Sequence, residues 1–373
     1  MAMDTIQVSS TPKVANIADI ENQIRALWRE ISEQSDGENA VTRVCTLTLI
    51  GYGANAQLAR RVRTAVPKIF SDHPCRALLI EADGDPDELS AWVTTVCQRQ
   101  ADEGEQVCCE ISLTVGENMR RRLPGTVLPL VVSDLPVFVW WPGPFHPASN
   151  VRTQLFAHAD RWIADSRDFT SPLHDLVQLY GLLKDDQTIA VSDLEWARLT
   201  PWRTMLANAF DLTVARPALT RLSELRLRTN GAPSATLLAA GWLASSLGWQ
   251  ATGHRAEGES DIYTFSGPAG PVTLTIEHDD ASPGRLPLLS TGCAAMPTLS
   301  VGLECHANQR SLVSTVRHDG ETITQVGALP DDDDGMTLAQ ELNVYSHDRI
   351  YEAVLAALAA MAAVRGDQSD THR

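Results

Sequence analysis

The residues with the clearest potential for chemistry lie in one short glycine turn. Gly51-Tyr52-Gly53-Ala54-Asn55-Ala56 matches G-x-G-x-x-A, a variant of the dinucleotide-binding turn, and lies between a predicted strand and a predicted helix. The next predicted strand ends in Glu81 and Asp83, where an acidic residue would meet a ribose hydroxyl. The alternative is a tight turn that needs glycine for backbone reasons alone. We favour this alternative because short glycine turns are common.

Other reactive residue types lack the spacing that catalysis or metal binding requires. The histidines form no HExxH motif and no i, i+4 pair on a predicted helix, so a metal site has no support. Ser133-Asp134 and Ser192-Asp193 lack a surrounding GxSxG elbow and are typical of turn and cap residues. The spacing therefore predicts no metal site and no catalytic residue.

The cysteines also show no recognised motif. Seven are present, at positions 45, 75, 97, 108, 109, 293 and 305, and none forms a CxxC pair. We expect most of them to be reduced, buried and hydrophobic in role. Cys293 and Cys305 flank a predicted strand and turn and are candidates for a redox switch. Core packing is the alternative, and we favour it.

Two runs rich in tryptophan, proline and arginine indicate protein contacts. The first is LVVSDLPVFVWW, residues 130–141, which Pro-Gly-Pro follows; the second is SDLEWARLTPWR, residues 192–203. Tryptophan and arginine dominate interface energetics, whereas neither run contains an activated nucleophile. The candidate partner-binding residues are Trp140, Trp141, Trp196, Arg198, Pro201, Trp202 and Arg203.

The same residues have internal alternatives. The tryptophans would also fill a core. Because side chains alternate along a strand, Trp140 and Trp141 should face opposite sides of the sheet, so we expect at least one to be exposed or at an edge. Arg198 and Arg203 would clamp partner carboxylates, or they would tie down Asp193 and Glu195 within the chain.

Together with ADRWIADS, residues 159–166, these runs resemble the glucose-6-phosphate dehydrogenase assembly protein family, called OpcA. The resemblance extends over roughly residues 40–345. It implies a protein that is not an enzyme and has no cofactor, a partner that binds an oligomeric glucose-6-phosphate dehydrogenase and activates it allosterically. This role would support the oxidative pentose phosphate pathway. The rival from another class is an NAD(P)-binding oxidoreductase that uses the Gly51-Tyr52-Gly53 turn.

Strand and helix signals alternate from residue 41 to residue 211, which predicts a Rossmann-like, mostly parallel sheet with helices on both faces. The predicted strands are 44–50, 77–81, 106–115, 136–141, 162–165 and 188–191, with a further apolar run at 127–132. The predicted helices are 54–70, 87–103, 150–158, 172–183 and 201–210.

The pattern changes after Arg216-Pro217: a strand is predicted at 222–228 and a helix at 234–247, and from residue 261 to residue 326 strands follow one another without intervening helices. This predicts an α+β domain with an antiparallel sheet, an acidic loop at Asp331–Gly335 and a closing helix at about 346–364. The predicted organisation is an N-terminal amphipathic helix and linker (1–40), a Rossmann-like α/β domain (41–214), the α+β domain (215–365) and a disordered tail (366–373).

Composition excludes several classes of partner. The chain has 373 residues and a formal net charge of −17, which disfavours nucleic acid because phosphate binding needs a basic surface. No window is apolar for long enough to span a membrane, and the N-terminus lacks the basic and apolar regions of a secretory signal. We therefore expect a cytoplasmic protein without membrane or nucleic-acid partners.

Overall fold

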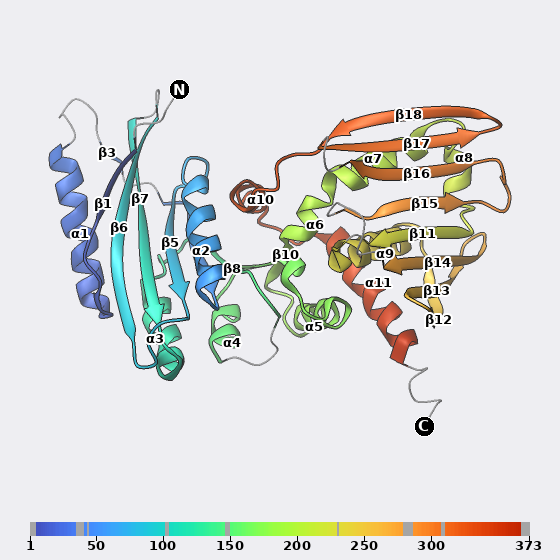
Figure 1. The fold of residues 1–373 in the computed structure, drawn as a ribbon. Coiled ribbons are helices and arrows are strands. Elements are labelled where there is room, and N and C mark those ends of the chain that lie inside the picture. The colour runs from blue at the N-terminus through green and yellow to red at the C-terminus, as the bar shows by residue number, and fades with distance from the viewer. Residues whose placement is uncertain are drawn as a thin grey trace. The chain divides into compact units, whose positions relative to one another are not determined.

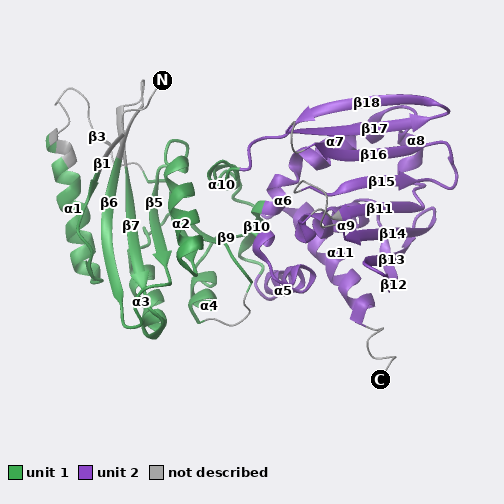
Figure 2. Cartoon of the chain, in the orientation of Figure 1, with its two compact units in different colours: residues 1–165, 187–194, 333–346 green, residues 166–186, 195–332, 347–373 purple. Residues whose placement is uncertain are grey.

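The computed structural model describes residues 5–34, 41–42, 45–100, 104–145, 150–229, 231–278, 286–306 and 310–366. It divides into two compact units (Figure 2), each of which is described by itself. Unit 1 contains residues 1–165, 187–194 and 333–346; unit 2 contains residues 166–186, 195–332 and 347–373. The predicted domains, in contrast, are contiguous, and their boundaries stay a prediction. Most of the predicted linker, 35–40, and of the predicted tail, 367–373, lies outside the described residues.

Six parallel strands form the centre of unit 1 (Figure 1). In spatial order they are β7 (Gly104–Val115), β5 (Cys75–Glu81), β4 (Leu47–Gly53), β8 (Val137–Trp141), β9 (Arg161–Ala164) and β10 (Ala190–Asp193). Each neighbouring pair in this series is parallel. The order is that of the dinucleotide-binding fold, 3-2-1-4-5-6. The predicted Rossmann-like sheet is therefore confirmed.

The predicted helix at 87–103 is wrong, because most of this segment forms the strand β6 (Leu89–Gln100). This strand pairs antiparallel with β7 from Leu89 opposite Val115 to Gln100 opposite Gly104. The segment WVTTV, residues 92–96, is rich in β-branched residues, which suit a strand once a partner strand is available. The short strands are β1 (Thr5–Ser9), β2 (Lys13–Val14) and β3 (Val41–Thr42); β1 and β2 pair with β6, and β3 with β7.

The apolar run at 127–132 continues a helical segment and forms no strand. It follows η2 (Glu117–Arg122) and contributes to α3 (Leu123–Val127) and η3 (Leu128–Leu130). A proline lies in the first turn of both α3 and η3, where its fixed φ suits a helix start. The two prolines, Pro124 and Pro129, therefore outweigh the apolar character of the run.

Helices cover both faces of the parallel sheet in unit 1. The helices are α1 (Ile17–Gln34), α2 (Ala56–Ala65), η1 (Val66–Ile69), α4 (Asn150–Phe156) and α10 (Asp334–Glu341). The predicted amphipathic helix α1 packs on β6 and buries Ile20, Ile24 and Leu27. Every residue of β4, β8, β9 and β10 is buried, as expected for a parallel sheet that is covered on both sides.

Unit 2 contains a mostly antiparallel sheet (Figure 1). Its strands, in spatial order, are β12 (Gln250–Glu257), β13 (Ser260–Gly267), β14 (Gly270–His278), β11 (Glu224–Thr229), β15 (Leu288–Gly292), β16 (Ser300–His306), β17 (Ser311–His318) and β18 (Glu321–Ala328). Only the β11–β14 pair is parallel among these neighbours. The predicted α+β domain with an antiparallel sheet is confirmed.

The helices of unit 2 pack on this second sheet or on one another. They are η4 (Ser166–Asp168), α5 (Pro172–Asp185), α6 (Leu194–Arg198), α7 (Thr200–Asp211), α8 (Arg216–Leu219), α9 (Pro233–Ser246) and α11 (Arg349–Gly366). The helix α9 packs on β11, α11 on β12, and α7 on β16 and β17. Along β14, Val272, Leu274 and Ile276 are buried, whereas Thr273 and Thr275 between them are half-exposed. This alternation is typical of a sheet with one covered face.

Candidate functional site

The glycine turn at the end of β4 allows α2 to pack directly on the strand. Neither Gly51 nor Gly53 has a positive φ angle. A Cβ atom on Gly53 would lie closer than 3.0 Å to the backbone N and Cα of Ala59, and one on Gly51 would lie closer than 3.0 Å to Val62 Cγ1. Glycine is therefore required here by the close approach of a helix to a strand, which needs no bound nucleotide.

The donors at the start of α2 are used by the chain itself. The N–H of Leu58 donates to Asn55 Oδ1 at 2.9 Å, and the N–H of Ala56 donates to Asp83 Oδ2 at 3.1 Å. In a dinucleotide-binding protein, the pyrophosphate lies at this helix N-terminus. Here a phosphate would come next to the Asp83 carboxylate, and two negative charges at this distance repel each other.

The second acidic residue at this edge is also engaged. Glu81 forms an ion pair with Arg63 of α2, and the Arg63 guanidinium lies 5.9 Å from the centre of the Trp92 ring. Glu81 and Asp83 were the two candidates for a ribose contact. The turn has the sequence pattern of a nucleotide site. Because both carboxylates contact α2, however, they support the helix.

Both tryptophans of the first run are buried in unit 1. The Trp141 ring stacks on Tyr52 at a centroid distance of 3.9 Å and lies 5.3 Å from the Trp162 ring. Burial raises the pKa of the Tyr52 hydroxyl above its ordinary value. Trp140 is fully buried, and the Arg61 guanidinium lies 6.0 Å from its ring centre. The expectation that Trp140 or Trp141 would be exposed is wrong, because both faces of the sheet are covered.

The second run forms α6 and the start of α7, and its tryptophans are likewise buried. Trp196 Nε1 donates to Asp348 Oδ2 at 2.9 Å, and Trp202 Nε1 donates to the Pro287 carbonyl at 2.8 Å. The Arg203 guanidinium lies 3.5 Å from the centre of the Trp196 ring. These contacts lie within unit 2, and they fix the run to the strands and helices of that unit.

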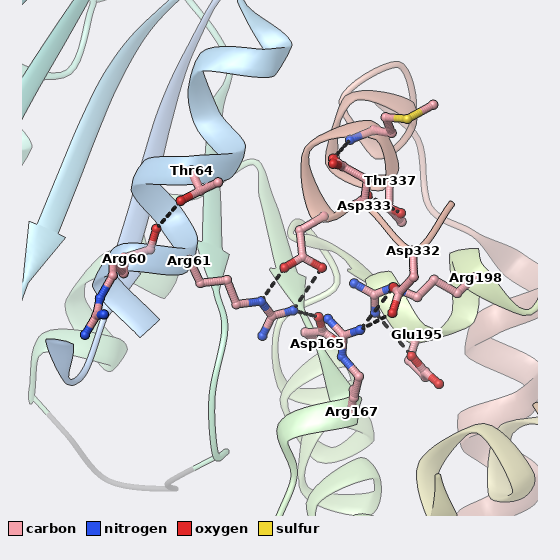
Figure 3. A network of polar contacts seen from close by, with 12 residues as sticks. Arg60, Arg61, Thr64, Asp165, Arg167, Glu195, Arg198, Asp332, Asp333 and Thr337 are labelled. Carbon is pink, nitrogen blue, oxygen red and sulfur yellow. Dashed lines mark hydrogen bonds and ion pairs between the residues drawn. The ribbon is translucent and has the colours of Figure 1, made fainter. Parts of the chain in front are cut away.

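Arg198 and the half-buried Pro201 complete this run. Arg198 pairs with Glu195 at 3.2 Å and with Asp332 at 3.2 Å (Figure 3). The contact with Glu195 matches the alternative in which the arginine ties the chain internally. The partner-binding role of Trp140, Trp141, Trp196, Arg198, Pro201, Trp202 and Arg203 stays a prediction, and their burial favours a supporting role.

The aspartate run at 331–334 is engaged by basic residues in each unit. In unit 2, Asp331 pairs with Arg310. Asp332 pairs with Arg167 and Arg198 (Figure 3). In unit 1, Asp333 pairs with Lys68, and Asp334 pairs with Arg61. Arg61 also contacts Asp165 (Figure 3).

Part of the predicted acidic loop is therefore the start of a helix. Asp333 Oδ1 accepts the N–H of Met336 at 3.0 Å and caps α10. The hydrogen bond from Lys68, aided by backbone donors, holds the Asp333 pKa below its ordinary value. An aspartate before a helical pattern is an N-cap signal that the sequence reasoning missed.

The cysteines are not paired with one another where the structure describes them. Cys293 is buried and donates to the Arg221 carbonyl, whereas Cys305 is half-buried on β16, and burial raises its pKa. Cys75 is buried in unit 1, and burial raises its pKa well above the ordinary value. The side chain of Cys97 lies outside the described residues. A redox role for Cys293 and Cys305 stays a prediction.

Two general features of the described residues bear on function. No group of three or more histidine, cysteine or acidic side chains among them has the arrangement of a metal site. None of their helices is long and apolar enough to cross a membrane. Sequence reasoning also missed a cavity in unit 2 around Asp261, because its lining comes from segments that are far apart in the chain.

Comparison with known proteins gives two family matches. Residues 66–181 match the family described as the glucose-6-phosphate dehydrogenase subunit N-terminal domain, and residues 189–355 match the corresponding C-terminal domain. A relative from Synechocystis sp., provisionally named as the OxPP cycle protein OpcA, is 28% identical over 79% of this chain. A relative with the same provisional name from Nostoc punctiforme is 32% identical over 51% of this chain. The chain spans 64% and 42% of the lengths of these two relatives.

A likeness to solved structures concerns the fold alone. An NAD binding oxidoreductase from Klebsiella pneumoniae is similar with a TM-score of 0.50 at 10% sequence identity, over 86% of this chain and 97% of that one. At this identity the likeness supports the Rossmann-like architecture and carries no information about substrate or activity.

Proposed function

The chain belongs to the glucose-6-phosphate dehydrogenase assembly protein family, OpcA, and on this premise we propose that it is a non-catalytic assembly factor and allosteric activator of that dehydrogenase. Its partner would be the oligomeric enzyme of the oxidative pentose phosphate pathway, in the cytoplasm. The observation that carries the proposal is the pair of family matches, which together extend over residues 66–181 and 189–355.

The glycine turn supports a role without a bound nucleotide. The close packing of Gly53 on Ala59 and the engagement of Asp83 by Ala56 explain the turn without a cofactor. The proposal therefore assigns the chain a binding role, and it assigns all catalytic residues to the dehydrogenase.

The mechanism we propose is a shift of a conformational equilibrium in the dehydrogenase. A partner that binds the active assembly more tightly than the inactive one increases the active population. By linkage, the same coupling must raise the affinity of the dehydrogenase for a substrate that prefers the active state. The expected signature is a lower apparent KM for glucose 6-phosphate.

The second candidate function is an NAD(P)-binding oxidoreductase, which the G-x-G-x-x-A pattern and the Rossmann-like strand order favour. An experiment on this chain without the dehydrogenase separates the two functions, since an oxidoreductase must bind its nucleotide without a partner protein. Calorimetric titration with NADP and NAD should give no binding heat. Tight binding of NADP or NAD would favour the oxidoreductase if Gly53→Ala or a substitution of Asp83 changed it.

The assembly role is tested by the oligomeric state of the dehydrogenase. Size-exclusion chromatography with light scattering should give a larger complex when this chain is added, and the assembled dehydrogenase should persist at lower protein concentration. Unchanged elution of both proteins at micromolar concentrations would contradict an assembly role. A variant with Arg349→Met, an exposed position on α11, serves as a folded control.

A further inference from the structure

A cavity in unit 2 is lined by basic side chains, and it is separate from the glycine turn and the tryptophan runs. It has a volume of about 540 Å³ and lies among α5, α9, α11, β13 and β14. This volume is within the range of small-molecule sites, which are mostly apolar with a few convergent polar groups. The apolar lining includes Pro172, Leu173, Val177, Leu237, Ile276 and Ala362.

One buried carboxylate contacts the basic side chains at this cavity. Asp261 Oδ2 accepts from Arg365 Nη1 at 3.2 Å and lies 3.3 Å from His278 Nε2, and Asp261 Oδ1 lies 2.8 Å from His254 Nε2. Burial alone would raise the Asp261 pKa, but the hydrogen bonds from both histidines and the charge of Arg365 together outweigh it. The pKa of Asp261 is therefore below its ordinary value, and both carboxylate oxygens are engaged.

Arg365 has further donors for a ligand, and the second ring nitrogen of His278, Nδ1, becomes a donor when the ring is protonated. The contacts of Arg365 with Asp261 and with the Tyr263 hydroxyl, at 3.4 Å, both involve Nη1, so Nε and Nη2 are not used in them. His278 likewise contacts Asp261 through Nε2 only. Both side chains line the cavity, and they are 47% and 45% exposed. An arginine edge suits the two oxygens of a carboxylate or phosphate.

The charges around the cavity favour an anion over a cation. Besides Arg365 and His278, the lining includes His174, whereas Asp261 is the only acidic residue among the described residues that line it. The nearby Asp175 accepts a hydrogen bond from the backbone N–H of Ser171 at 3.1 Å, at the start of α5. Basic side chains therefore outnumber acidic ones in the described lining, although the chain as a whole has a formal net charge of −17.

We propose that this cavity binds a small organic anion. Its carboxylate or phosphate group would meet Arg365 and His278, and its apolar body would lie against α5, α9 and α11. The ligand class follows from the combination of an apolar wall with donors at one side. The proposal does not depend on the dehydrogenase, because the described cavity is built entirely within unit 2.

The test uses isothermal titration calorimetry on the full chain, without the dehydrogenase. The probes are hexanoate and phenyl phosphate, with inorganic phosphate and hexylammonium as controls for the apolar body and for the charge. Small ligands bind weakly, so we expect dissociation constants on the order of 1 mM for both organic anions. Both controls should bind at least about tenfold more weakly.

Variants assign the binding to this cavity. Arg365→Met keeps an apolar stem but removes the charge and the donors, and it should weaken hexanoate binding at least about tenfold. His278→Gln, at a half-exposed position, should weaken it less and provides a second test if Arg365→Met does not fold. Arg349→Met, on the same helix but outside the cavity lining, should bind hexanoate unchanged.

Three results would overturn the proposal. They are no binding heat from either organic anion, equal binding of hexylammonium and hexanoate, and unchanged hexanoate affinity in folded Arg365→Met and His278→Gln. None of these results bears on the complex with the dehydrogenase, so the failure of this site would leave the proposed function untouched.

Discussion

The glycine turn of unit 1 and the Asp261 cavity of unit 2 both contain a carboxylate that accepts hydrogen bonds. Its effect on anion binding is opposite in the two places. In the turn, the Asp83 carboxylate accepts the first N–H of α2 and occupies the place that a phosphate would take. In the cavity, the Asp261 carboxylate contacts Arg365 through Nη1 and His278 through Nε2, and neither contact involves the remaining nitrogens of these side chains. Asp83 therefore disfavours an anion at the start of α2, whereas Asp261 orients the basic side chains that would bind an anion in the cavity.

The difference teaches where to look for ligands in this fold. The turn has a strong sequence pattern, but α2 packs against its glycines, and the first N–H groups of α2 donate within the chain. The cavity has no sequence pattern, but the contact of Arg365 with Asp261 involves Nη1 alone. Substitutions in the glycine turn, at the Arg198 ion pairs and at Asp261 therefore test this difference.

The largest expected effect concerns the packing of α2 on β4. Gly53→Ala places a Cβ against the backbone of Ala59, which cannot move as a flexible side chain would. We expect it to lower the free energy of unfolding by about 3 kcal/mol, since overpacking at a rigid contact is costly. Urea denaturation measures the change.

A matched control is Gly181→Ala in α5, where a Cβ would meet no atom within 4 Å. This change should stabilise the protein by about 0.5–1 kcal/mol, because alanine is the better helix former. Equal stability of the two variants would mean that the turn is not closed by packing.

The next effect concerns the brace around Arg198. Arg198→Ala leaves the buried Glu195 carboxylate without this partner, so we expect a loss of about 2–3 kcal/mol of stability. If Arg198 also contacts the dehydrogenase, affinity falls by a further ~1–3 kcal/mol. Melting and complex affinity are measured on the same variant. A normal melting temperature with weakened binding would place Arg198 on the contact surface.

An effect confined to acid pH concerns Asp261. Because its pKa is depressed in the folded state, it contributes stability above the pKa of an unfolded aspartate, about 4, and this contribution is lost as pH falls through the lower folded pKa. Wild type should therefore exceed Asp261→Asn in stability at pH 6, and the difference should shrink below pH 4. A difference that stays constant from pH 6 to pH 3 would show that Asp261 acts without its charge.

The smallest effect concerns Asp83. Asp83→Asn keeps an acceptor for the exposed Ala56 N–H, so we expect a stability loss of at most about 0.5–1 kcal/mol. Removing the negative charge should not create measurable NADP binding, because the turn remains closed by Ala59 and Asn55. Calorimetry that detected NADP binding in this variant would mean that charge alone closes the turn.

Local patterns predicted both sheets, and non-local pairing explains the errors. The alternation of strands and helices gave the parallel sheet, and the hairpin signals gave the antiparallel one. The segment at 89–100 was predicted as part of a helix, whereas its β-branched residues form a strand once β7 is available as a partner. The burial of Trp140 and Trp141 depends on helices that cover both faces of the sheet, which strand periodicity alone does not report.

The candidate sites differ in the same way. The glycine turn was visible because its residues are consecutive, but its closure by Asp83 depends on a residue of the next βα unit. The cavity brings together residues from near 174, 261, 278 and 365, so no local spacing could indicate it.

The most direct test of the central claim is a substrate titration of glucose-6-phosphate dehydrogenase with and without saturating amounts of this chain. The proposed activation predicts a lower apparent KM for glucose 6-phosphate in the presence of the chain, and no dehydrogenase activity in the chain alone. The same KM and the same maximal rate in both titrations would contradict it.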